Sequence, residues 1–156
     1  KGLMRNFNRF KLTPENRQNE LKFRKSMFRA HQILGFVTLG EMLVQGIIGS
    51  QLYKGNMDIK NAHETMGMMV NITYFTNASI PLFSPPKMFN ERKGFSNIKL
   101  HKILAIVHFS SMVATNIFAC KLARKIDTNY NLRKYHRAAA YTAFGSYAAS
   151  MIVIKF

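Results

Sequence analysis

The sequence has few acidic residues and a single cysteine. Its 156 residues include seven Asp and Glu against 23 Lys and Arg, a formal net charge of +16. The lone Cys120 excludes an intrachain disulfide and a cluster of thiolate ligands. Nucleic-acid-binding proteins share such a charge balance, but they do not usually carry several long apolar runs. Basic residues that flank apolar runs fit anionic lipid headgroups better, so we expect a lipid bilayer, and no nucleic acid, as the partner.

Four apolar runs predict the fold. They cover roughly residues 30–53, 61–83, 99–121 and 135–156. Each is close to the ~20 helical residues that cross ~30 Å of hydrocarbon. The polar residues inside these runs are expected to face other helices or neighbouring proteins. We therefore expect an all-α integral membrane protein, an up-down four-helix bundle whose transmembrane domain is residues 26–156.

A polar and basic N-terminal arm, residues 1–25, precedes the first run. We expect it to be solvated or to lie on the lipid surface. The stretch Thr13-Pro14-Glu15-Asn16 is typical of a helix start, with Thr13 as the cap and Pro14 in the first turn. A partly helical arm is therefore the alternative.

The distribution of Lys and Arg predicts the orientation. The arm, residues 84–102 and Lys155 together carry more basic residues than residues 54–60 and 121–137. This bias places both termini on the inner side, meaning matrix or cytosol. The basic N-terminus without an initiating Met suggests a removed targeting segment, and it favours the mitochondrial inner membrane.

Four of the five histidines share one local pattern. Each stands at or near the start of an apolar run and is followed four residues later by a small residue. The pairs are His31 with Gly35, His63 with Gly67, His101 with Ala105, and His136 with Ala140. Positions i and i+4 share one face of a helix. Each helix would thus present an imidazole with a small residue one turn deeper, the gap that a flat ligand held by histidine needs.

Helix direction sorts these histidines into two pairs. Helices alternate in direction across a membrane, so His31 and His101 are expected on one side and His63 and His136 on the other. In an up-down bundle each pair lies on diagonal helices, where two imidazoles can clamp a haem iron. Such ligation leaves no open iron position and suits electron transfer. The similarity of HQILGFV at 31–37 to HKILAIV at 101–107 also predicts that the first and third helices are duplicates.

With a histidine near the start of each of four helices, at spacings of 32, 38 and 35 residues, the chain resembles the cytochrome b561 family over about residues 27–156. The resemblance implies two b-type haems, held by His31 with His101 and by His63 with His136. It also implies transmembrane electron transfer, often from ascorbate or toward ferric iron. The family's donor-site motif, Ser-Leu-His-Ser-Trp, reads Lys-Leu-His-Lys at 99–102, and the chain has no Trp. This departure removes the support for ascorbate as the donor.

Two alternatives remain open. One is a haem-free accessory subunit of a large respiratory membrane assembly, because the basic arm and the weakly apolar helices suit a protein surrounded by other membrane subunits. The other is a membrane anchor with a single haem, similar to that of respiratory complex II. In that case His108, seven residues after His101, is the alternative ligand; otherwise we expect it to be a hydrogen-bonded interior histidine. We expect Glu41 to pair with a polar neighbour such as His108 or Asn116.

Overall fold

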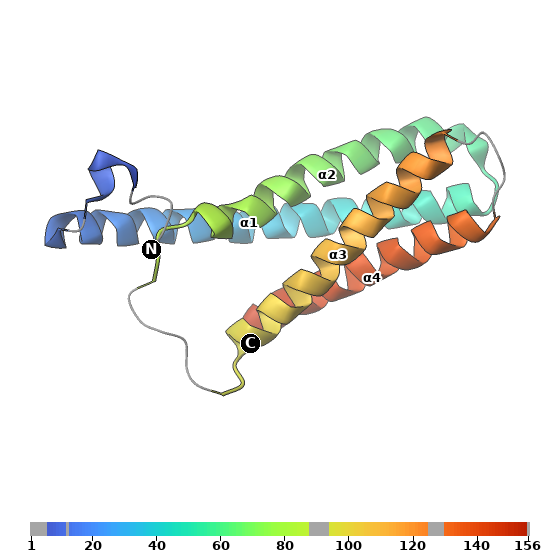
Figure 1. Ribbon diagram of the computed structural model, residues 1–156. Helices are drawn as coiled ribbons and strands as arrows, with labels where there is room; N and C mark the ends of the chain where they lie inside the picture. The colour runs from blue at the N-terminus through green and yellow to red at the C-terminus, as the bar shows by residue number, and fades with distance from the viewer. Residues whose placement is uncertain (1–5, 12, 88–93, 125–129, 156) are drawn as a thin grey trace. The chain divides into compact units, whose positions relative to one another are not determined.

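The computed structural model describes residues 6–11, 13–87, 94–124 and 130–155. Within these ranges the chain forms helices and connections, without strands (Figure 1). The elements are η2 (Asn8–Phe10), α1 (Pro14–Tyr53), η3 (Met57–Ile59), α2 (Lys60–Phe83), α3 (Asn97–Arg124) and α4 (Tyr130–Lys155). The expected all-α fold with four helices is confirmed. Parts of the predicted arm, connections and last run lie outside the described residues.

Helix α1 begins much earlier than the first apolar run. The backbone N–H of Asn16 donates to Thr13 Oγ1 at 3.2 Å, an N-cap contact. Pro14 takes the first helical position, where its missing N–H costs nothing. From there α1 continues for 40 residues to Tyr53. The second half of the expected arm is therefore helical, and the predicted boundary at residue 26 falls inside α1.

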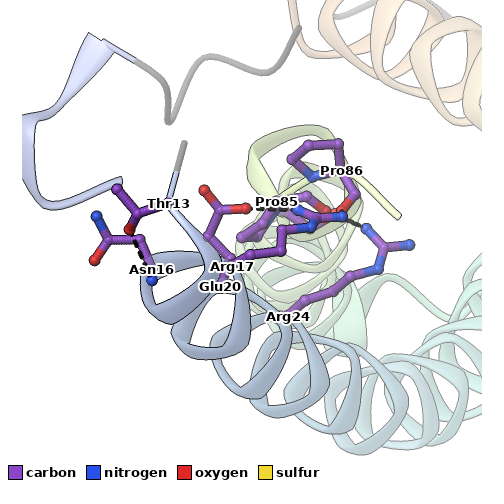
Figure 2. A network of polar contacts seen from close by, with 8 residues as sticks. Thr13, Asn16, Arg17, Glu20, Arg24, Pro85 and Pro86 are labelled. Carbon is purple, nitrogen blue, oxygen red and sulfur yellow. Dashed lines mark hydrogen bonds and ion pairs between the residues drawn. The ribbon is translucent and has the colours of Figure 1, made fainter. Parts of the chain in front are cut away.

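A network of polar contacts holds the first turns of α1 to the segment that follows α2 (Figure 2). The Glu20 side chain is fully buried and accepts from Arg17 Nη1 at 2.5 Å. Arg17 Nη2 donates to the carbonyl of Pro86 at 2.8 Å, and Arg24 Nη1 donates to that of Pro85 at 2.5 Å. Burial and the neighbouring Arg17 charge lower the pKa of Arg24. Because buried charges need such partners, this network fixes α1 well before its apolar stretch.

Apart from Glu20, the buried residues of the four helices follow one spacing. Counted from the histidine of each helix, they recur at alternating steps of four and three residues, the stripe that a helix buries in a bundle. We call this stripe the histidine seam. Its buried members are Gly35, Thr38, Met42, Val70, Tyr74, Asn77, His108, Met112, Ala143, Tyr147 and Ser150. The predicted small residues Gly67, Ala105 and Ala140 lie on the same stripe and are partly exposed.

The chain divides into two compact units, Lys1–Glu41 with Gly67–Glu91 and Met42–Met66 with Arg92–Phe156. In the first unit, contacts of Arg24 with Pro85 and of His31 with Asn77 show that α1 and α2 run antiparallel. In the second unit, α3 and α4 lie side by side and run in opposite directions (Figure 1). Each unit is therefore built on an antiparallel helix pair.

Helices α1 and α3 are long and apolar enough to cross a membrane. Only 17% and 11% of their most apolar windows are buried, far less than in the core helix of a soluble protein. Among the described helices, α2 and α4 do not reach the same apolar character. The reason is in their sequences, because α2 carries several Asn, Thr and Ser residues and the first turns of α4 are basic. Two of the four predicted spans thus have spanning character.

Candidate functional site

His31 projects from α1 toward the backbone of α2. Its Nδ1 lies 3.1 Å from the carbonyl oxygen of Asn77. A carbonyl oxygen can only accept, so Nδ1 carries the proton and donates it. The lone pair of the neutral ring is then on Nε2, which is the nitrogen that such a ring offers to a metal.

His101 and His136 have the same arrangement in the second unit. His101 Nδ1 lies 2.9 Å from the carbonyl oxygen of Ser150, and His136 Nδ1 lies 3.0 Å from that of Thr115. Each contact joins α3 to α4 and fixes both the tautomer and the plane of the imidazole. A backbone carbonyl in this position is the usual partner of a metal-binding histidine. In three of the four histidines, the Nδ1–carbonyl contact therefore leaves the lone pair of the neutral ring on Nε2.

His63 is held differently, by the last part of α1. Gln45 Nε2 donates to the carbonyl oxygen of His63 at 3.0 Å and lies 3.5 Å from its ring Nε2. The buried His63 Nδ1 has no hydrogen-bond partner among the described residues. A Cβ at Gly49 would lie only 2.9 Å from His63 Cε1. The close approach of this ring to α1 therefore depends on glycine.

His63 and His136, one of the two predicted pairs, lie together in the second unit. Their ring centroids are 6.3 Å apart, and the ring planes make an angle of 78°. Two imidazoles that bind one metal from opposite sides, through bonds of about 2 Å, have ring centres roughly 6 Å apart. The two rings meet edge to face, and the distance between their centroids is close to that of such a pair.

The other predicted ligands have different surroundings. His31 and His101 belong to different units, so their pairing stays a prediction. His108 is buried, as an interior histidine would be, and its ring packs edge to face on Tyr147 with centroids 5.0 Å apart. Glu41 accepts a hydrogen bond from Thr73 Oγ1, a partner that the sequence analysis did not name.

The contacts of the two helix pairs correspond. His31 and its carbonyl partner Asn77 are 46 residues apart, and His101 and Ser150 are 49 apart. Gln45 and His63 are 18 residues apart, and Thr115 and His136 are 21 apart. In both comparisons, the sequence separation in the α3–α4 pair exceeds that in the α1–α2 pair by the same number of residues. The two helix pairs therefore place their contacts at equivalent positions, although Gln45 uses its side chain where Thr115 uses its carbonyl; the duplication itself stays a prediction.

The carbonyl partners, Gln45 and Gly49 escaped the sequence analysis. Asn77, Ser150, Gln45, Thr115 and Gly49 all fall on the histidine seam when its steps are continued beyond the small residue. Continuing the four- and three-residue spacing from each histidine along the whole helix would have identified these positions. The contacting group is a backbone carbonyl, which every residue has, so the residue type does not reveal the contact.

A haem needs fewer protein ligands than a bare metal ion. Within the described ranges, no group of three or more His, Cys, Asp and Glu is placed to hold a metal ion. A haem iron is already held by its porphyrin and takes only axial ligands from the protein.

Comparison with known protein families, curated proteins and solved structures found no match to this chain.

Proposed function

We propose that the protein is an integral membrane electron carrier with two bis-histidine b-type haems, similar in design to the cytochrome b561 family. The observation that supports it most is the shared orientation of His31, His101 and His136, each of which donates from Nδ1 to a backbone carbonyl. A purely interfacial histidine has no need of this orientation. Bis-imidazole haem supplies a one-electron couple without an open iron position.

The residues divide into two ligand pairs. His63 and His136 form the first pair, on the basis of their 6.3 Å ring separation. His31 and His101 form the second, because they occupy equivalent positions of the two helix pairs, as His63 and His136 do. Gly35, Gly67, Ala105 and Ala140 leave room for the porphyrin one turn along each seam.

The exposed surfaces of α1 and α3 support the proposed membrane setting. Their exposed apolar side chains include Phe36, Val37, Ile47, Ile103 and Ile106. Exposed side chains of this size suit lipid tails or other membrane subunits. We place the protein in the mitochondrial inner membrane, with both termini on the matrix side and within a larger respiratory assembly.

A difference spectrum of the purified protein, reduced minus oxidised, tests the proposal. We expect the α-band of a low-spin b-type haem and two haems per chain. His63→Ala and His136→Ala should each remove the same haem, and His31→Ala should remove the other. Absence of an α-band contradicts haem binding, and loss of different haems from His63→Ala and His136→Ala contradicts the pairing.

A haem-free accessory subunit is the second candidate function. Each of the three Nδ1–carbonyl contacts also joins two helices, so they can serve as structural links without any cofactor. In that case His101→Ala lowers the free energy of unfolding by about 1 kcal/mol, the value of one hydrogen bond, and the protein has no visible chromophore. The same spectrum separates the two functions.

A further inference from the structure

The two helix pairs differ four residues after the carbonyl that the first histidine contacts. In α4 the residue four after Ser150 is Ile154, whereas in α2 the residue four after Asn77 is Pro81. In an α-helix the carbonyl of residue i accepts from the N–H of residue i+4. Proline has no N–H. The Asn77 carbonyl therefore lacks the intrahelical donor that Ile154 offers to Ser150.

The His31 ring occupies this position on the helix. Its Nδ1 lies 3.1 Å from the Asn77 oxygen, so the imidazole N–H takes the place of the amide N–H that Pro81 lacks. A proline inside a helix costs about 3 kcal/mol, in part through the lost hydrogen bond. Here the lost backbone bond and the bound imidazole are at the same oxygen atom.

We propose that Pro81 is a positioning residue for His31. By removing the amide N–H at the i+4 position, it removes a competitor of the imidazole for the Asn77 carbonyl, keeps the proton on Nδ1 and directs the Nε2 lone pair away from α2. His101 shares its carbonyl with an amide N–H, and His63 Nδ1 has no acceptor among the described residues. Of the three histidines with an Nδ1–carbonyl contact, His31 is the one whose carbonyl partner is followed four residues later by proline. That its Nε2 binds haem iron rests on the proposed function; the role of Pro81 does not.

Exchange of the His31 ring proton with water tests this role. The full chain is labelled with 15N-histidine, purified in detergent and kept reduced, so that any bound low-spin haem is diamagnetic. In the unaltered chain the His31 proton resides on Nδ1 and exchanges slowly. In Pro81→Ala a new amide N–H competes for Asn77, and exchange should be about fivefold faster, the equivalent of one hydrogen bond of about 1 kcal/mol.

The controls are in the same helix and in the same spectrum. Ile80→Ala changes a neighbouring side chain but adds no N–H, and it should leave His31 unchanged. The Nδ1 protons of His101 and His136 should not respond to either variant. Unchanged exchange in a folded Pro81→Ala chain overturns the proposal, as does a proton found on Nε2 of His31 in the unaltered chain. The position of the His31 ring proton is measured in the unaltered chain, so the proposal can be tested even if Pro81→Ala does not fold.

The same samples separate this inference from the haem proposal. A chain without an α-band whose His31 proton responds to Pro81→Ala supports the role of Pro81 and refutes haem binding. A chain with two haems whose His31 proton does not respond to Pro81→Ala supports haem binding and refutes the role of Pro81.

Discussion

The imidazole rings of His63 and His136 lie with centroids 6.3 Å apart and planes at 78°. They come from α2 and α4, the second helices of two corresponding helix pairs, and they occupy equivalent positions. Each is the first residue of its histidine seam. The meeting of equivalent residues places two imidazoles together in the second unit, and it is the basis for the proposed pairing of His63 with His136.

Gly49→Ala should disrupt this site. The new Cβ would lie 2.9 Å from His63 Cε1, so the ring has to turn away from α1 and from its place beside His136. We expect the haem content to fall to half that of the unaltered chain, with a stability loss of about 1–3 kcal/mol from overpacking. Haem quantification and thermal unfolding in detergent measure the two effects.

Gly46→Ala is the matched control, because it lies three residues away on the same helix and a Cβ there meets nothing within 4 Å. It should retain full haem content and gain up to about 1 kcal/mol from helix propensity. Equal behaviour of the two variants would show that His63 does not depend on Gly49.

Gln45→Leu should weaken the attachment of α2 to α1 in the second unit. Gln45 donates to the His63 carbonyl at 3.0 Å and lies beside the ring. We expect a loss of about 1 kcal/mol in the free energy of unfolding, together with a changed absorption spectrum of the haem that His63 ligates. Gln51→Leu, at an exposed position of the same helix, is the control and should change neither. An unaltered spectrum in Gln45→Leu contradicts the assignment of Gln45 as a partner of His63.

Glu20→Ala should destabilise the start of α1. The carboxylate is fully buried and paired with Arg17, whose side chain remains 21% exposed. Removal of one partner from a buried pair costs 3–5 kcal/mol when both are inaccessible. With Arg17 partly solvated, we expect about 2 kcal/mol. Faster backbone amide exchange in the first turns of α1 checks this, and Gln18→Ala, at an exposed position, should show no such change.

His108→Ala separates the two-haem site from a single-haem anchor. His108 is buried and packs on Tyr147, so its removal should cost about 2 kcal/mol through the cavity that it leaves. Haem content should not change, because His108 is not a ligand in the proposed site. A chain that loses all its haem through this one substitution fits the single-haem alternative and contradicts the proposal.

Local sequence signals predicted much of the fold. Thr13 and Pro14 indicated the start of α1 through cap chemistry, and the four apolar runs indicated four helices. Residues 14–25 of the expected arm are helical, and Arg17 pairs with Glu20 and contacts Pro86, a residue distant in sequence. No local pattern contains that information.

The site was predictable in part for a similar reason. The four histidines and their small neighbours follow a short repeat, which any single helix reveals. The partners that orient the rings are backbone carbonyls on another helix, and every residue type has a carbonyl. Only Pro81 marks one of them, since it removes the donor that would otherwise compete for Asn77.

The most direct test of the central claim is the haem stoichiometry of the purified full chain, measured together with its difference spectrum, reduced minus oxidised. Two low-spin b-type haems per chain are predicted, and His63→Ala and His136→Ala should each leave the same single haem behind. A chain purified in folded form without a haem α-band would contradict the proposed function.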